Sequence, residues 1–329
     1  MSKEDYLDKT HVEFERLLYE YISPKIIDES GYSSSSFNAK LSENNNSFFE
    51  TEYYYKENRK FVHWTSVQNL MSIINNREFR LYNLHNSSDH EEFVYSAEKL
   101  LLSEKHIEYS KRYLYTLSFC EAKELNNSDL WESYGQKYTG VAIEFEINND
   151  PNFWKKFILS EVFYKLPNKF ISLKYELDKL QKKYPGTSYF IDLGKLIAFH
   201  KKTMFSRERE IRLATYFPYD RKEAYEVFGN TEFKYDKDKV RITDYIPLKL
   251  WVNNTSPFVK GSRPEFDKSL KVEESYFDKN PRIKISGIHF GKNCMFKGQD
   301  FIPFWKKLNY ITKIKLGYEI ENLKPNLYG

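Results

Sequence analysis

The sequence predicts a mixed α+β fold, dominated by short β-strands with helices on the outside. Short apolar or alternating runs, typical of strands, recur along the chain, and segments with helical spacing of apolar residues lie between them. Aromatic residues make up 18% of the chain, with 27 Tyr and 26 Phe. Rings must therefore supply much of the core packing.

The composition argues against a glycine-rich phosphate-binding loop. With 329 residues, the chain is long enough for one or two domains with a sizeable core. Only 12 residues are Gly, and neither the G-x-x-x-x-G-K nor the G-x-G-x-x-G phosphate-binding pattern is present. The net charge is +4, from 51 basic and 47 acidic residues, which neither requires nor excludes a nucleic-acid partner.

Cysteine use and hydropathy predict a cytoplasmic protein. Cys120 and Cys294 are far apart in the sequence, which fits a reducing compartment better than a disulfide framework. No apolar run is long enough to span a bilayer, and the N-terminus lacks the apolar core of a signal peptide. We therefore expect a soluble cytosolic protein with no membrane partner.

The sequence predicts four segments. Residues 1–29 hold an amphipathic helix, and residues 30–57 form a linker rich in Ser and Asn. Residues 58–318 form a single α+β domain of catalytic type, and residues 319–329 form a C-terminal tail. Within the domain, the apolar patterns predict strands near 61–64, 79–82, 113–119, 140–147, 161–164, 210–217, 245–252, 283–290 and 311–316. Helices are predicted near 66–74, 90–104, 128–134, 171–182, 189–205 and 298–308.

The stretch from Phe205 to Phe217 is the first candidate for a functional site. Glu208 and Glu210 are separated by one residue and lead into an apolar strand. On a strand, residues two apart project from the same face, so both carboxylates would point the same way. Two acids on a rigid strand suit catalysis, but they also suit a solvated strand edge with arginine partners. Arg212 is expected to hold Glu210 or the sheet by a salt bridge rather than to contact a substrate.

Other residue types with chemical potential lie before this stretch. His63 is expected at a strand-to-helix junction, where a neutral imidazole can bind a ribose hydroxyl or simply bond a backbone carbonyl. Ser118 ends a predicted strand and could orient a ligand or cap a turn. Trp131 and Tyr134 share one helix face, where they could stack on a planar ring or belong to the core.

Metal and serine-nucleophile sites are less favoured by the sequence. The acidic loop with His85, Asp89 and His90 matches no zinc spacing such as H-E-x-x-H, and acidic loops are usually solvated. The G-x-S-x-G nucleophile pattern is absent. We therefore predict no metal site.

An ordered set of short motifs resembles the bacterial family known as domain of unknown function 2971. The set resembles that family over roughly residues 60–310, with Ser88 and Ile211 departing from its usual pattern. The motifs are Phe61-Val-His-Trp-Thr-Ser, Asn86-Ser-Ser-Asp-His-Glu91, Thr116-Leu-Ser-Phe, Leu130-Trp-Glu-Ser-Tyr-Gly, Thr139-Gly-Val-Ala-Ile-Glu-Phe, Glu208-Arg-Glu-Ile-Arg-Leu and Ile288-His-Phe-Gly.

The chain also resembles ADP-ribosyltransferases more loosely. These enzymes place His or Arg on a first strand, Ser or Tyr on a later one, and Glu, often as Glu-x-Glu, at the head of another. The order His63, then Tyr82 or Ser118, then Glu210 is similar to this plan. The resemblance implies a split β-sheet core with flanking helices and NAD as the cofactor. It implies NAD contacts for six residues, with the choice between Tyr82 and Ser118 as the middle residue left open: His63, Thr65, Tyr82, Ser118, Trp131 and Tyr134.

The same resemblance implies roles for the carboxylates and for the protein. Glu210 would stabilise the positively charged ribose, and Glu208 would orient the acceptor, which is RNA, DNA or protein. Enzymes of this plan act as toxins in bacterial toxin–antitoxin and phage-defence systems, so an antitoxin or other defence protein is an expected partner.

Two other functions stay open on the sequence. One is a non-catalytic sensor or partner-binding subunit of a defence assembly. The other is a metal-dependent hydrolase or nuclease that uses His63, Asp89 and Glu210.

Overall fold

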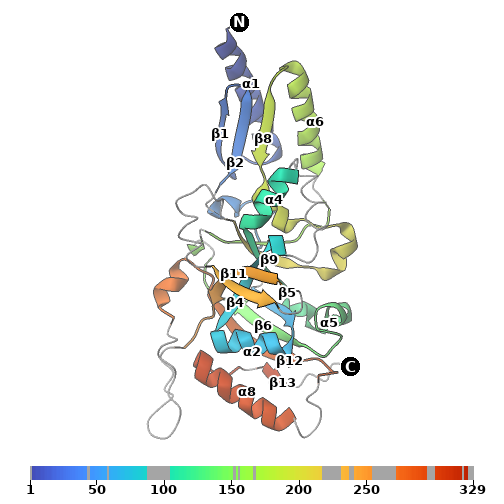
Figure 1. Cartoon of the computed structure of the whole chain (residues 1–329), viewed down its shortest axis with the longest axis vertical. Helices are drawn as coiled ribbons and strands as arrows, with labels where there is room; N and C mark the ends of the chain where they lie inside the picture. Colours follow the sequence, from blue (N-terminus) through green and yellow to red (C-terminus); the bar gives the residue numbers. More distant parts are fainter. Residues whose placement is uncertain are drawn as a thin grey trace.

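The fold was analysed in a computed structural model of the chain. The structure describes residues 2–42, 45–57, 59–86, 104–150, 153–154, 156–165, 168–216, 231–236, 241–253, 272–294, 301–320 and 322–324. It is a mixture of α and β structure, as the sequence predicts, and it contains a curled antiparallel sheet with helices (Figure 1). No helix in these ranges is both long enough and apolar enough to cross a membrane.

The large sheet forms the body of the molecule. Among the described residues it contains ten strands, with β9 pairing with β5 and β7 pairing with β9. All pairs are antiparallel except β12 with β13. The path runs β10 (Glu232–Asp236), β11 (Arg241–Lys249), β4 (Glu78–Asn83), β5 (Leu114–Glu121), β3 (Lys60–Thr65), β6 (Val141–Ile147), β12 (Ile283–Phe290) and β13 (Asn322–Lys324), with β7 (Ile158–Glu161) and β9 (Ile211–Tyr216) off it.

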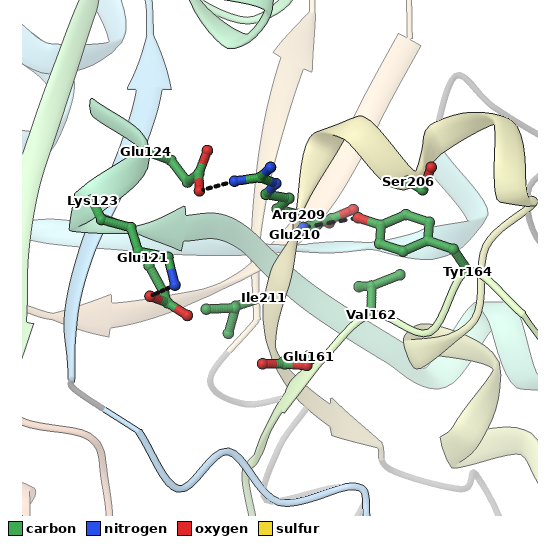
Figure 2. Close-up of a pocket in the computed structure, with 10 residues that line it drawn as sticks. All are labelled: Glu121, Lys123, Glu124, Glu161, Val162, Tyr164, Ser206, Arg209, Glu210 and Ile211. Atoms are coloured by element: carbon green, nitrogen blue, oxygen red, sulfur yellow. Dashed lines mark hydrogen bonds and ion pairs between the residues drawn. The ribbon is translucent and has the colours of Figure 1, made fainter. Parts of the chain in front are cut away.

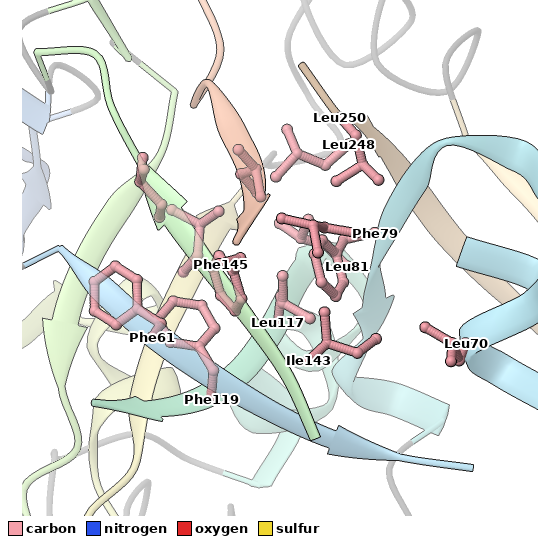
Figure 3. Close-up of a cluster of buried hydrophobic side chains, with 14 of the residues drawn as sticks. Phe61, Leu70, Phe79, Leu81, Leu117, Phe119, Ile143, Phe145, Leu248 and Leu250 are labelled. Carbon is pink, nitrogen blue, oxygen red and sulfur yellow. The ribbon is translucent and has the colours of Figure 1, made fainter. Parts of the chain in front are cut away.

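Strand β5 joins the two parts of this sheet. Its first residues pair with β4 and β9, whereas Cys120 and Glu121 pair with β3. The sheet curls here, because Phe79 of β4 and Phe145 of β6 lie 5.1 Å apart although three strand pairings separate β4 from β6. Figure 3 shows the resulting body core, in which rings and aliphatic side chains from both parts pack together.

Helices cover the body on its outer side. Helix α2 (Val67–Asn76) begins after Ser66, whose side chain accepts from the Asn69 amide, and ends at a left-handed Arg77. Helix α8 (Phe301–Leu316) packs against α2 and lies at the end of the body away from α1 (Figure 1). The short helix α5 (Ser128–Ser133) precedes β6, and α4 (Glu104–Tyr113) precedes β5.

An N-terminal lobe packs above the body. It combines α1 (Lys3–Tyr21) and a three-stranded sheet of β1 (Ile27–Ser33), β2 (Ser36–Leu41) and β8 (Ser188–Asp192) with α6 (Asn168–Lys183). Segments far apart in sequence therefore build one lobe (Figure 1). An ion pair between Glu13 and Lys183, with a separation of 2.6 Å, links α1 to α6.

The N-terminal lobe differs from the irregular linker that the sequence predicted over residues 30–57. All of β2 and part of β1 fall in that range. The alternation of Phe37, Ala39 and Leu41 buries one face of β2, and the Ser and Asn content of the segment concealed it. Helix α1 is consequently part of a packed lobe.

Two further elements depart from the predictions. The helix predicted over 189–205 is replaced by β8 and by two 3₁₀ helices, η5 (Gly194–Phe199) and η6 (Thr203–Glu208). The strand predicted at 311–316 is the end of α8, where Leu308, Thr312 and Leu316 recur every four residues and are buried. The helix predicted at 90–104 lies outside the described residues except for its last position.

Candidate functional site

The two glutamates of the Phe205–Phe217 stretch are joined by a lysine. The Nζ atom of Lys201 lies 2.7 Å from Oε2 of Glu208 and 2.6 Å from Oε2 of Glu210. Glu208 is the last residue of η6, and β9 begins only at Ile211. We call Glu208 and Glu210, which Lys201 joins, the carboxylate pair.

The predicted arrangement of these glutamates on one strand face is therefore wrong. Arg209, between them, has a left-handed backbone with a φ of 46°, so the chain turns before the strand starts. Such a conformation is costly for a residue with a long side chain, and strained residues cluster at functional sites. Lys201, which the pattern of the stretch does not reveal, brings the carboxylates together instead.

Glu210 is buried and ionised. Its side chain is 7% exposed, and Arg212 binds it through Nε, 2.6 Å from Oε1, and Nη2, 3.1 Å from Oε2. Burial by itself would raise the pKa of Glu210, but Arg212 and Lys201 outweigh burial and lower the pKa to about 2. The salt bridge predicted between Arg212 and Glu210 is confirmed.

Glu208 lies closer to the solvent. It accepts a hydrogen bond from the hydroxyl of Tyr134, a residue that is 45% exposed. Its backbone carbonyl accepts from the Sγ atom of Cys120 at 3.2 Å, and burial raises the pKa of that thiol. Tyr134 thus binds a carboxylate of the pair in this structure.

Ser118 and Tyr82 lie on the strands beside the carboxylate pair. Ser118 pairs with Arg212 across β5 and β9, and Tyr82 pairs with Thr116 across β4 and β5. Cross-strand partners share a face, and so do residues two apart. The side chains of Tyr82 and Ser118 therefore lie on the same face of the sheet as Arg212, which holds Glu210.

His63 lies on the opposite face. Its ring packs against Phe79 in the body core, with centroids 5.7 Å apart, and Phe61 and Phe119 share that core. The Nδ1 atom donates to the backbone carbonyl of Ser118 at 2.9 Å, so the ring reaches the main chain of β5 but not the Ser118 hydroxyl. Burial lowers the pKa of His63, which keeps the imidazole neutral.

Thr65 and Trp131 make their side-chain contacts with other groups. The Thr65 hydroxyl accepts from Nδ2 of Asn69 at the start of α2. Trp131 is 1% exposed, donates from Nε1 to the Leu125 carbonyl and stacks on Tyr138. Trp131 therefore serves core packing and offers no open ring face.

A cavity of about 420 Å³ opens at the ends of β5, β7 and β9 (Figure 2). Lys123 pairs with Glu121, and Arg209 pairs with Glu124, each at 2.7 Å. The hydroxyl of Tyr164 accepts from the backbone N–H of Glu210 at 2.8 Å. The lining residues are Glu121, Lys123, Glu124, Glu161, Val162, Tyr164, Ser206, Arg209, Glu210 and Ile211.

Glu161 is the carboxylate of this cavity without an ion pair among the described residues (Figure 2). Burial and the neighbouring charges of Glu57 and Glu121 raise its pKa. A cation in the cavity would relieve that repulsion. Sequence reasoning missed Glu121, Glu161 and Tyr164, because they come from three separate segments that no local pattern connects.

Metal ligation finds no support in the described part of the chain. No group of three or more His, Cys, Asp or Glu side chains there is arranged to hold a metal ion. Asp89, which the metal-dependent alternative requires, lies outside the described residues.

Comparison with known proteins gives one match. A family model described as "Protein of unknown function (DUF2971)" matches residues 130–213, from the last part of α5 into β9. The match includes the carboxylate pair and supports the family resemblance over this segment, about a quarter of the chain. No curated protein and no solved structure matches the chain, and none of these comparisons supports the resemblance to ADP-ribosyltransferases.

Proposed function

We propose that the chain is an NAD-dependent ADP-ribosyltransferase that acts at the carboxylate pair. The observation that carries the proposal is the ionised Glu210 carboxylate, at the head of β9, beside the cavity and one strand from Ser118. Cleavage of the bond between nicotinamide and ribose develops positive charge on the sugar, as glycoside cleavage does. A fixed carboxylate stabilises that charge.

The cavity suits the nicotinamide end of NAD. Its volume falls within the range of about 300–1,000 Å³ that is common for small-molecule sites. The acidic lining suits the positively charged nicotinamide, and Glu161 is the carboxylate that such a cation would neutralise. Arg209 and Lys123 are the lining cations that would meet the diphosphate.

The carboxylates then take separate roles. Glu210 stabilises the charged ribose, and Glu208, which is bound by Tyr134 nearer the solvent, orients the acceptor nucleophile. Lys201 keeps the two carboxylates together. Because His63 faces the core, it supports β5 through the Ser118 carbonyl and does not contact NAD in this scheme. An RNA, DNA or protein acceptor and a role as a phage-defence toxin with an antitoxin partner rest on the resemblance alone.

One observation favours a second candidate, a non-catalytic partner-binding subunit. The Glu210 carboxylate is satisfied by Arg212 and Lys201 and is 7% exposed, as a purely structural ion pair would be. In that case the wild-type chain would neither release nicotinamide nor bind NAD.

The test uses NAD labelled in its adenylate half, incubated with the full chain and with separate RNA, DNA and protein fractions. We expect nicotinamide release and label transfer to one fraction. Glu210→Gln should lower nicotinamide release by at least about 100-fold, the usual loss when a charge-stabilising group is removed. Glu208→Gln should lower transfer to the acceptor more than nicotinamide release.

Controls separate chemistry from folding. Glu20→Gln changes an exposed glutamate of α1 that pairs with Arg16, and it should leave both reactions unchanged. Circular dichroism establishes that each variant is folded. A wild-type chain that releases no nicotinamide and transfers no label would contradict the proposal. Full activity in Glu210→Gln would show that the carboxylate pair is not the catalytic site.

A further inference from the structure

Helix α8 concentrates positive charge in a chain whose total charge is nearly balanced. The helix contains Lys306, Lys307, Lys313 and Lys315 and no acidic residue. The neighbouring α2 has no charged side chain at all. These two helices lie together at one end of the body (Figure 1), and all the charged side chains in them are lysines of α8.

Lys306 and Lys307 lie on the outer surface of α8. Both side chains are exposed, and no described residue forms an ion pair with either. Lys313, in contrast, pairs with Glu319. Lysines in the last turn of a helix complement its dipole, but Lys306 and Lys307 lie in the first half of α8, where the dipole gives no benefit.

Tyr310 completes this surface. Its side chain is 51% exposed, and it lies four residues after Lys306 and three after Lys307, so all three share one face of the helix. We call Lys306, Lys307 and Tyr310 the α8 face. Two ammonium groups that form no ion pair with the described residues, beside an open aromatic ring, suit single-stranded nucleic acid, because phosphates bind the cations and a base stacks on the ring.

We propose that the α8 face binds single-stranded nucleic acid. A membrane fits less well, because the apolar side of α8, with Leu308, Thr312 and Leu316, is buried against the body and cannot enter a bilayer. The binding itself is independent of the carboxylate pair. Only the further step, that such a strand is the acceptor of ADP-ribose, rests on the proposed function.

The test is fluorescence anisotropy of the full chain with labelled single-stranded RNA and DNA of about 20 nucleotides, titrated between about 50 and 200 mM salt. Replacing both cations, as Lys306→Glu with Lys307→Glu, should weaken binding at least about tenfold at low salt. The slope of log affinity against log salt should fall by about 1.4, since each phosphate contact with a single strand contributes about 0.7. Tyr310→Leu should weaken binding about tenfold and leave the salt slope unchanged, because stacking releases no counterions.

A charge reversal on α1 supplies the control. Lys3 and Lys9 are exposed, so Lys3→Glu with Lys9→Glu makes the same change in net charge and should leave affinity near that of wild type. An equal loss in this control, or unchanged binding after the α8 substitutions, would overturn the proposal. Binding to vesicles of anionic lipid without binding to either strand would assign the α8 face to a membrane instead.

Discussion

At the scale of single residues, Glu210 is the most constrained group at the candidate site. A buried carboxylate that touches both Arg212 and Lys201 is stabilised only while all three are charged. Removing one member of such a set leaves the others buried without compensation. Folding stability should therefore follow the ionisation of Glu210.

The pH dependence of stability tests this coupling. The pKa of Glu210 falls from 4.5 to about 2 on folding. Because the folded pKa is the lower one, the stabilisation is fully present above the unfolded value of 4.5 and is lost as pH falls toward 2. It amounts to up to about 3 kcal/mol. Urea unfolding at about pH 7, 5 and 3 should show a smaller loss on acidification for Glu210→Gln than for wild type.

The control for this measurement is Glu20→Gln, whose exposed side chain is paired with Arg16 on α1. Its stability should fall with acid in parallel with that of wild type. If the stability of Glu210→Gln also falls with acid in parallel with that of wild type, the Glu210 ion pairs contribute no net pH-dependent stability.

At the scale of elements, the connection from α5 to β6 has unusual backbone geometry. Gln136, Lys137 and Tyr138 are three consecutive left-handed residues, with φ of 51°, 52° and 66°. The turn is held from outside, because the amides of Gly291 and Asn293 donate to the carbonyls of Gly140 and Tyr138, respectively. The close approach of the Tyr138 carbonyl leaves no room for a side chain at Gly291, the last residue of the motif Ile288-His-Phe-Gly.

Gly291→Ala should test that contact. A Cβ at Gly291 would lie 2.2 Å from the Tyr138 carbonyl oxygen, so the strained turn must move. We expect a loss of about 1–3 kcal/mol in the free energy of unfolding, the usual cost of overpacking. Gly31→Ala, where a Cβ meets nothing within 4 Å, is the matched control and should change stability little. Equal effects in the two variants would mean that Gly291 tolerates a side chain.

At the scale of the whole molecule, the N-terminal lobe and the body share packing. The lobe core includes Leu114, Ile158 and Ala214, which belong to strands of the large sheet. Cores that share side chains should unfold together. The chain therefore should behave as one cooperative unit, although two sheets are present.

Tryptophan fluorescence can measure this coupling. All five tryptophans, at positions 64, 131, 154, 251 and 305, lie outside the segments that build the lobe. Leu18→Ala in α1, where Leu18 is fully buried in the lobe core, should cost about 2–5 kcal/mol and shift the tryptophan unfolding curve. Val12→Ala, at an exposed position of the same helix, should leave the curve unchanged. An unshifted curve for a destabilised Leu18→Ala would show that the lobe unfolds separately.

The candidate site was only partly predictable from the sequence. Spacing favoured the ion pair of Glu210 with Arg212, because residues two apart at the entry to a strand lie close together without help from the rest of the fold. Spacing failed for Glu208, because a left-handed Arg209 ended the strand pattern before it. Ser118 lies beside Arg212 because β5 pairs with β9. The alternation of side chains along β3 directs His63 to the other face of the sheet.

By itself, the sequence determined the mixture of short strands and helices, the body strands such as Phe61–Trp64, and the charge balance. These follow from the local periodicity of apolar residues. Only the tertiary structure decided that residues 27–41 join 168–192 in a lobe and that Lys201 bridges Glu208 and Glu210. The same holds for the cavity, which three strand ends surround. The physical reason is that strand pairing and buried ion pairs join residues distant in sequence, and a local pattern does not identify such partners.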